Sequence, residues 1–554
     1  MADLGRTALS LGWGLGIARR RGALALRRAA RFLLPFGRAR YRRFLFAPPD
    51  LRTADPTMAA DFYAGQFIFA GQLVELHGQS PFDAEPPSRA WAEGLHGFGW
   101  LRHLHAANTA LARDNARSLV AQFIKDGRQR GPVAAQPLVA SRRVMAFLSH
   151  SPLVLEGADH DFYHAYLACV QADLRAMQDA SRLSDDPAAQ LAVLCAAAAA
   201  GLCIEGAERL ADRAGAALAQ ALDEQILADG GHVSRNPRVL VELMLDLLPL
   251  KATYAARGME TPASIIAAID RIVPHIRMLR HGDGALALFN GMGATQVETL
   301  ATIFACCDVA GGPAMEAPHS FYARLEAGAS LLLVDAGAPP PFAASGEAMA
   351  GAASFEFSHA RQRIFVNCGA PRRTPPGAGP ELRSTAAQNA TVVADTSSAR
   401  FLARGEVVRL HGGPGKVTLQ RVTEPHLTTI RMSHDGYARR FGVRIERDIA
   451  LSADGDILQG EERLALLGDK ATLPPFVTRF HIHPHLKALA LSGAAVDLIL
   501  PTGGIWRFAV EGGRADLEES AFFAGADGAR RTAQIVLSPE TGNSVMRWSL
   551  KRVV

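Results

Sequence analysis

Residues 354–367 read SFEFSHARQRIFVN. In the first half, apolar and polar side chains alternate, which places Phe355 and Phe357 on one face of an extended strand and Ser354 and Glu356 on the other. The second half, QRIFVN, is again strand-like, and only a short connection separates the two. The pattern predicts an antiparallel β-hairpin with one face in an apolar core.

Strand-length segments punctuated by Gly, Pro, Asp and Asn surround this hairpin on both sides. They predict a large antiparallel β-sandwich over residues 313–554. The other segments are ASLLLVDAG (329–337), NATVVAD (389–395), FGVRIERDIALSAD (441–454), TRFHIHP (478–484) and VDLILPTGGIWRFAVE (496–511).

The residues before the sandwich have helical periodicity. Two Ala-rich stretches, residues 186–204 and 205–227, predict successive helices that end near Gly230 and Gly231. A third helix is expected to begin at Pro237, with Asn236 as its N-cap. Many Ala-rich helices with short connections predict close packing, as in a bundle or a toroid of helical hairpins. The fold class is therefore α+β and multidomain: a helical domain over residues 56–312, followed by the β-sandwich.

Residues 1–55 form an Arg-rich arm. Its charge predicts contact with acidic lipid, acidic glycan or nucleic acid, and a merely basic surface helix is the alternative. No aromatic-interleaved pattern favours nucleic acid, so peripheral membrane contact is the partner expected of the arm. Within residues 1–52 there are only two acidic residues, Asp3 and Asp50, and twelve arginines: Arg6, Arg19, Arg20, Arg21, Arg27, Arg28, Arg31, Arg38, Arg40, Arg42, Arg43 and Arg52.

The remaining composition is that of a folded protein: of 554 residues, 49% are hydrophobic and 20% charged. The apolar stretch of the arm precedes its arginines and is interrupted by Gly, so no secretory signal is predicted. No run of apolar residues has the length of a membrane span. None of the six cysteines forms a CxxC pair, and they are expected to be small buried side chains.

Several motifs occur in a characteristic order along the chain. FGWLRHL (98–104) lies in the helical half, ADGGHVSRNPRVLVELMLDLLPL (228–250) closes it, and STAAQNATVV (384–393), SHDGY (433–437) and RFHIHP (479–484) follow in the β half. Together they resemble the heparinase II/III family of polysaccharide lyases, over most of residues 60–545. The resemblance implies a helical toroid, an antiparallel β-sandwich, an acidic polysaccharide as substrate and a place in the cell envelope or periplasm. The absence of an export signal keeps a cytoplasmic location as the alternative.

The family's catalytic residues are incomplete in this chain. The resemblance places a Tyr-His pair at Val239 and Leu240, and a histidine at Gln388, with Asn389 retained. Neither Val239 nor Leu240 can move a proton, and Gln388 can hydrogen-bond a sugar but cannot act as an acid or base.

Other residues are candidates for the missing roles. His232, His434 and Tyr437 are the candidate proton-transfer groups, although an exposed loop histidine and a structural tyrosine are the simpler explanations for His232 and Tyr437. Strand geometry places Arg479, His481 and His483 on one face, as a row that binds acidic sugar, holds a structural divalent metal or packs against a neighbouring strand. The predicted substrate-binding residues are Gln388, Asn389, Arg235, Arg238 and Arg479, and the predicted metal ligands are His481 and His483.

Three functional hypotheses follow. The first is a lyase that cleaves a uronate polysaccharide by β-elimination, in which a base removes the proton beside the carboxylate and an acid protonates the leaving oxygen. The second is a non-catalytic protein that binds glycan or serves exopolysaccharide export and retains the lyase fold. The third is a hydrolase, which would need a carboxylate pair among Glu75, Asp83 and Glu242. None of the three requires a cofactor.

Overall fold

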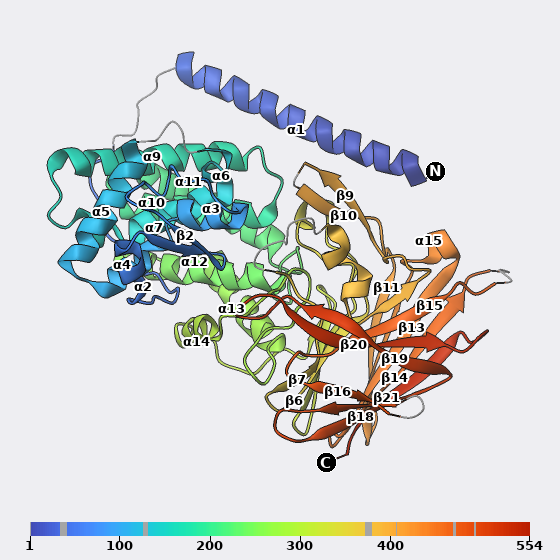
Figure 1. Cartoon of the computed structure of the whole chain (residues 1–554). Coiled ribbons are helices and arrows are strands. Elements are labelled where there is room, and N and C mark those ends of the chain that lie inside the picture. Colours follow the sequence, from blue (N-terminus) through green and yellow to red (C-terminus); the bar gives the residue numbers. More distant parts are fainter. Residues whose placement is uncertain are drawn as a thin grey trace. The chain divides into compact units, whose positions relative to one another are not determined.

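The computed structural model describes residues 2–33, 41–125, 131–371, 379–405, 407–468, 472–491 and 495–553 (Figure 1). The chain divides into two compact units. The helical unit comprises Met1–Gln225, Val241–Ile269 and Glu298–Asp308, and the β unit comprises Ile226–Leu240, Asp270–Val297 and Val309–Val554. The predicted domain boundary at residue 312 lies close to the last of these divisions, but two earlier segments also belong to the β unit.

The hairpin predicted over residues 354–367 is present. Strands β6 (Ser354–His359) and β7 (Gln362–Phe365) pair antiparallel, within a sheet of order β3-β4-β5-β6-β7. Both faces of β6 are buried. On the face opposite Phe355, the segment around Leu288 covers the strand, and the backbone N–H of Leu288 donates to Glu356 Oε1. The hairpin is therefore internal to the β unit, with a second layer over its polar face.

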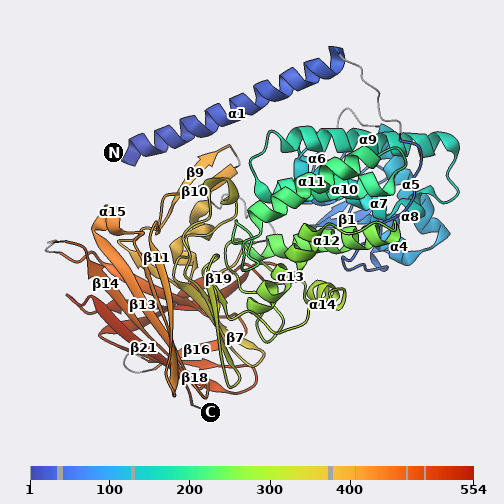
Figure 2. The ribbon, with the colours of Figure 1, turned by 180° about the vertical axis from the view of Figure 1, so that it is seen from behind.

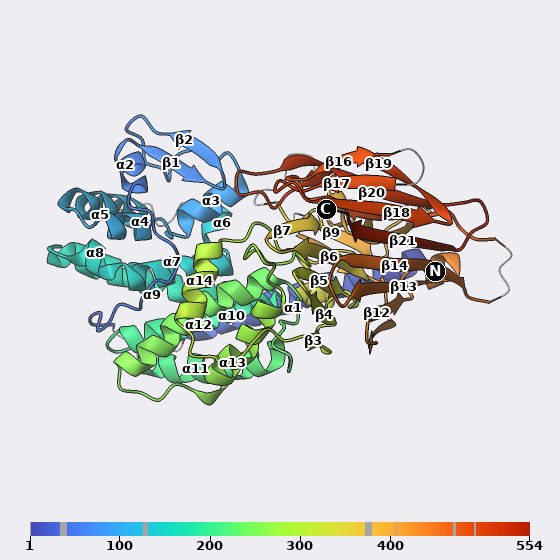
Figure 3. The same cartoon turned by 90° about the horizontal axis from the view of Figure 1, so that it is seen from below.

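The strands of the β unit form an antiparallel sandwich. An eight-stranded sheet has the order β11-β12-β13-β14-β21-β18-β17-β16, and a four-stranded sheet has the order β19-β20-β15-β8. Figure 3 shows β17, β18, β21, β14, β13 and β12 following one another across the larger sheet. The remaining strands are β3 (Glu316–Ala317), β4 (Tyr322–Ala327), β5 (Ser330–Asp335), β8 (Thr391–Val393), β9 (Arg400–Arg404), β10 (Val407–His411), β11 (Val417–Thr423), β12 (Leu427–His434), β13 (Val443–Ser452), β14 (Ile457–Leu466), β15 (Phe476–His481), β16 (Lys487–Ala490), β17 (Ala495–Ile499), β18 (Ile505–Glu511), β19 (Gly513–Phe522), β20 (Arg530–Pro539) and β21 (Val545–Arg552).

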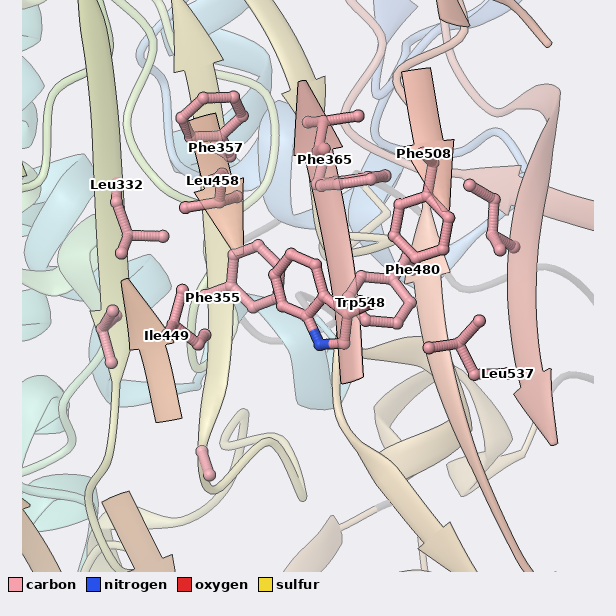
Figure 4. Packing of buried hydrophobic residues seen from close by; sticks show 14 of the residues in the cluster. Leu332, Phe355, Phe357, Phe365, Ile449, Leu458, Phe480, Phe508, Leu537 and Trp548 are labelled. Carbon is pink, nitrogen blue, oxygen red and sulfur yellow. The ribbon is translucent and has the colours of Figure 1, made fainter. Parts of the chain in front are cut away.

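One apolar core holds these sheets together (Figure 4). Phe355 stacks on Trp548 with ring centroids 5.9 Å apart, and Phe480 contacts both rings. These aromatic side chains come from β6, β21 and β15, so the core joins strands from all three large sheets. Aromatic pairs add to the gain from burying apolar area.

The helical unit contains the predicted Ala-rich pair. Helices α10 (Pro187–Cys203) and α11 (Glu208–Gln225) lie side by side in Figures 1 and 2. Small side chains permit this close approach, because a Cβ on Gly201 would lie 2.3 Å from the backbone nitrogen of Ala211. The unit also holds a small hairpin of β1 (Gln66–Phe69) and β2 (Gln72–Glu75).

Helices α12 (Pro237–Ala256), α13 (Ala263–Met278) and α14 (Val297–Ala305) have residues in both units. The predicted start of α12 is confirmed, because Asn236 Oδ1 accepts the backbone N–H of Arg238 at 2.9 Å. No described helix is both long and apolar enough to cross a membrane. The other helices are α1 (Ala2–Leu33), α2 (Met58–Tyr63), α3 (Arg89–His96), α4 (Leu101–Ala107), α5 (Ala110–Lys125), α6 (Gly131–Ala134), α7 (Pro137–Ser149), α8 (Ser151–Leu155), α9 (His160–Ser181) and α15 (Ala438–Phe441).

One predicted strand is shorter than expected. Residues 389–395 contribute only β8, because Gln388 and Asn389 lie in a turn after a short 3-10 helix, η3 (Thr385–Ala387). The backbone N–H of Ala390 donates to the carbonyl of Gln388 at 2.8 Å, which closes this turn and delays the strand to Thr391.

Candidate functional site

Asn389 connects three segments of the β unit. Its side chain donates from Nδ2 to the carbonyl of Phe355 at 2.8 Å and accepts the backbone N–H of His481 at 2.6 Å. Its backbone N–H donates to Asn367 Oδ1 at 2.8 Å. Asn389 is fully buried, so this amide, a predicted substrate-binding group, is used for internal hydrogen bonds.

Gln388 is also buried, but its contacts are weaker. Its Nε2 donates to the sulfur of Met349 at 3.3 Å, and a Cβ on the neighbouring Gly351 would lie 3.4 Å from its Oε1. Thioether sulfur is a weak acceptor, so this amide contributes less to the fold than Asn389 does.

A buried ion pair lies behind Asn389. Arg447 Nη1 donates to the carbonyls of Asn389 and Ala353, at 2.6 and 2.7 Å, and its Nε lies 2.8 Å from a carboxylate oxygen of Glu462. Both side chains are 1% exposed. Burial raises the pKa of Glu462, an effect that Arg447 opposes. The pair is thus part of the scaffold around residues 388 and 389.

The row Arg479, His481 and His483 does not form an exposed cationic face. His481 and His483 are buried, and burial lowers the pKa of His481 to about 4 and of His483 to about 2. His481 Nε2 donates to the carbonyl of Ala386 at 3.0 Å, so its Nδ1 accepts from the Ser520 hydroxyl at 2.7 Å. Ser520 of β19 and Ala386 of η3 therefore pack against His481. This arrangement agrees with the third alternative given above, in which the row packs against a neighbouring strand. Arg479 is paired with Glu518 at 3.2 Å.

The SHDGY turn is equally internal. His434 is 2% exposed, and burial lowers its pKa to about 4. The hydroxyl of Tyr437 lies 2.9 Å from the carbonyl of Thr396 and 3.1 Å from that of Thr391. Burial raises the pKa of Tyr437, so both side chains are held neutral within the protein.

The turn before α12 contains His232, which is 1% exposed rather than solvent-exposed. Its Nδ1 accepts from the backbone N–H and the hydroxyl of Ser234, and burial lowers its pKa to about 3. The preceding Gly230 has φ +83°, and a Cβ there would lie 1.9 Å from the carbonyl oxygen of Arg271, so the turn requires glycine.

The two arginines of this turn have acidic partners within the β unit. Arg235 is buried with φ +59°; it donates to the carbonyls of Ser320 and Ala338 and pairs with Asp335. Burial alone would lower the pKa of Arg235, but Asp335 raises it. Arg238, by contrast, is half-exposed and pairs with Glu347.

Val239 and Leu240, where the resemblance places a Tyr-His pair, follow directly. Val239 is partly exposed and Leu240 is buried.

The helical unit contains a pocket of about 300 Å³ that the sequence did not predict. Its charged lining residues are Arg52, Arg102, Arg142, Asp50 and Glu93, of which Glu93 pairs with Arg89; the apolar and aromatic side chains beside them include Phe69. These residues lie far apart in the chain, although Arg102 belongs to the FGWLRHL motif. Pockets with a few convergent polar groups among apolar walls are the usual form of ligand sites.

Two further predictions concern metals and carboxylates. Among the described residues, no group of three or more His, Cys, Asp or Glu side chains has a geometry that could hold a metal ion. Glu75 accepts a hydrogen bond from Gln66, and Glu242 pairs with Arg52 and Arg142. Asp83, the third candidate, is exposed, and the hydrolase hypothesis stays a prediction.

Known proteins resemble this chain over most of its length. Residues 310–549 match the family model described as heparinase II/III-like, C-terminal. FtsZ-localized protein C of Caulobacter vibrioides (strain NA1000 / CB15N) is 32% identical over 532 residues, which are 91% of this chain and 89% of that protein.

Solved structures share the fold at low sequence identity. A crystal structure of heparinase III matches with a TM-score of 0.71 and 12% identity, covering 92% of this chain and 88% of that one. Heparan sulfate lyase HepC from Pedobacter heparinus matches with a TM-score of 0.55 and 14% identity, covering 96% and 88%. The helical domain followed by an antiparallel β-sandwich is thus confirmed as the fold class, and the chain belongs to the heparinase II/III family.

Proposed function

We propose that this protein binds an acidic, uronate-containing glycan without cleaving it and retains the lyase fold as a scaffold. One observation supports the proposal: Gln388, which the resemblance places at the position of a family histidine, lies in a buried network whose side chains are neutral or internally paired. A glutamine there can hold a sugar hydroxyl but cannot transfer a proton.

β-Elimination needs a base and an acid that reach the sugar. His232, His434 and Tyr437 are the candidates for those roles, and all three are at most 2% exposed. Their burial holds the two histidines neutral at pH 7, so neither is an acid there, and a buried ring nitrogen does not contact a substrate. The competing hypothesis is an active lyase. In such a lyase, substrate binding would have to move these side chains before any of them could transfer a proton.

The test is incubation with uronate polysaccharides, followed by ultraviolet absorbance of the unsaturated sugar that β-elimination produces. We expect no increase, while isothermal titration calorimetry detects binding of at least one acidic oligosaccharide. An increase that disappears in His232→Gln or Tyr437→Phe would establish the lyase instead. Gln388→His is the matched gain-of-function variant, and its activation would show that the remaining site is competent.

A second candidate function comes from the relative in Caulobacter vibrioides, whose name describes localisation with FtsZ. Sequence similarity over 91% of this chain supports the same association here. Co-sedimentation of the purified protein with FtsZ polymers tests it. Recovery in the supernatant at all protein concentrations would reject it, and this outcome is independent of glycan binding.

The Arg-rich arm supports contact with an acidic membrane surface. Leu11, Leu15 and Leu26 of α1 are each more than 60% exposed and share one face by helical spacing. Arg19 lies beside that face, and exposed leucines flanked by arginines suit an anionic lipid surface. Flotation with phosphatidylglycerol vesicles should recover the wild type, and Leu11→Asp with Leu15→Asp should abolish recovery. Retention of that variant would contradict the membrane contact. Such contact fits either an envelope or a cytoplasmic location.

A further inference from the structure

The pocket of the helical unit is lined by three arginines whose charges are not equally compensated. Arg142 Nη1 lies 2.6 Å from Asp246 Oδ1, and Arg52 Nη2 lies 3.2 Å from the same oxygen. Glu242 pairs with both arginines, at 3.1 and 3.0 Å. Neither Asp246 nor Glu242 lines the pocket, so the charges of Arg52 and Arg142 are balanced from outside it.

Arg102 is different. Among the described residues, its one ion pair joins Nε to Asp50 Oδ2 over 3.6 Å, too long for a hydrogen bond. Within the described part of the chain, this Nε is buried and has no hydrogen-bond partner. Asp50 is itself shared with Arg52, at 3.8 Å, and with His150, at 3.3 Å. Arg102 is therefore the least compensated of the three guanidinium groups.

The Arg102 side chain is 22% exposed, and a partly buried guanidinium whose Nε has no hydrogen-bond partner favours an anionic ligand. Arginine carries five N–H donors in a planar fork that matches a carboxylate. Burial lowers the pKa of Arg102, which shows the cost of keeping this charge in place. An anion from solvent would supply the missing acceptors and offset that cost.

The surroundings of Arg102 suit a sugar ring rather than a bare ion. One wall of the pocket is apolar and aromatic and consists of Met58, Ile68 and Phe69. His103 adds a polar side chain to the lining. A volume of about 300 Å³ is at the small end of ligand pockets, which fits a single ring better than a long chain segment.

We infer that this pocket binds the carboxylate of a hexuronate, with Arg102 as the residue that contacts the carboxylate. The inference rests on the proposed function and assigns that function a site in the helical unit. The hexuronate is either a free sugar acid or a residue of a polysaccharide, since both present the same carboxylate and ring.

Gly99 provides an independent variant of this site. A Cβ on Gly99 would lie 2.4 Å from Arg102 Nη2, and its other near neighbour is the guanidinium carbon. Gly99→Ala therefore displaces the guanidinium without a clash against backbone. Arg102→Gln removes the charge itself and relieves a poorly compensated burial, so both variants should fold.

The experiment is isothermal titration calorimetry with glucuronate, its uncharged methyl ester and trigalacturonate. We expect Arg102→Gln and Gly99→Ala to weaken acidic-ligand binding at least about tenfold, the effect of losing a charged hydrogen bond. The methyl ester should bind the wild type as weakly as the acid binds Arg102→Gln. The matched control is Arg113→Gln, because Arg113 has an ion pair of the same length, 3.6 Å to Glu156, and does not line the pocket.

The outcomes separate the site from the function. Binding of both acids with the expected losses supports a site for the free sugar acid, and binding of trigalacturonate alone with the same losses supports a site for the polymer. Acid binding that Arg102→Gln and Gly99→Ala leave unchanged overturns the site while the proposed function stands. No binding of any acid to the wild type overturns both.

Discussion

The Asn389 network of the β unit and the arginine pocket of the helical unit use polar side chains in opposite ways. Around Asn389, the side-chain amide hydrogen-bonds to Phe355 and His481, and the buried charge of Arg447 is balanced by Glu462 at 2.8 Å. In the pocket, Arg102 faces a cavity with its charge poorly compensated. Polar residues whose hydrogen bonds are satisfied within the β unit serve the scaffold, as Asn389 does. Ligand binding is better sought where satisfaction is incomplete.

The largest expected effect comes from breaking the ion pair that supports the β-unit network. Glu462→Gln leaves Arg447 buried without a carboxylate and should lower the free energy of unfolding by about 3–5 kcal/mol. Urea denaturation measures the loss. The control is Glu461→Gln, a partly exposed neighbour paired with Arg463 and Arg547, which should cost at most about 1 kcal/mol. Equal losses in both variants would show that the buried pair has no special role.

The two neighbouring amides should differ. Asn389→Ala leaves the carbonyl of Phe355 and the N–H of His481 buried without partners, which should cost about 2–3 kcal/mol. Gln388→Met preserves volume and removes only the bond to a sulfur, so its cost should stay below about 1 kcal/mol. Urea denaturation of the two variants side by side measures the loss in the free energy of unfolding. A larger loss for Gln388→Met would mean that Gln388, and not Asn389, is the amide that stabilises the fold.

The β unit should also lose stability in acid. His434 and His481 have pKa values of about 4 when folded, against 6.5 for an ordinary histidine. As pH falls from 6.5 to 4, the unfolded chain binds protons that the folded chain does not, so acid favours unfolding. Each such histidine costs at most about 1.4 kcal/mol per pH unit, a slope approached between the two pKa values and fading above pH 6.5.

Urea denaturation between pH 7.5 and 5, at constant ionic strength, measures this loss. His434→Gln should reduce the slope below pH 6.5. An unchanged slope in that variant would mean that His434 is protonated in the folded protein, as an accessible acid would be.

The smallest effect is expected at Arg238, on the surface of the β unit. Its side chain is 46% exposed and that of its partner Glu347 is 52% exposed. Arg238→Ala should therefore change the free energy of unfolding by less than about 1 kcal/mol. If the same variant abolishes trigalacturonate binding while thermal denaturation shows no loss of stability, a glycan contact at Arg238 would be established and the pocket would not be the sole site.

The sequence predicted features that depend on local pattern. The 354–367 hairpin follows from alternation, and the start of α12 follows from Asn236 and Pro237. Features that depend on distant segments were not predicted. Alternation placed His481 and His483 on one face correctly, but it could not show that Ser520 and Ala386 cover that face.

The pocket also depends on segments that lie far apart in the sequence, and for that reason it was not predicted. Asp50, Arg102 and Asp246 are separated by long stretches of chain, and no spacing between them indicates an ion-pair cluster. The motif FGWLRHL contains Arg102 but does not reveal that its guanidinium is poorly compensated. Only the fold of the helical unit supplies that information.

Hydrogen–deuterium exchange of the wild type with and without saturating trigalacturonate tests the comparison most directly. We expect slower exchange in peptides over residues 97–107, which include Gly99 and Arg102, and no change over residues 384–393. Slower exchange over residues 384–393, with residues 97–107 unchanged, would place the ligand at Gln388 and Asn389 and contradict the account.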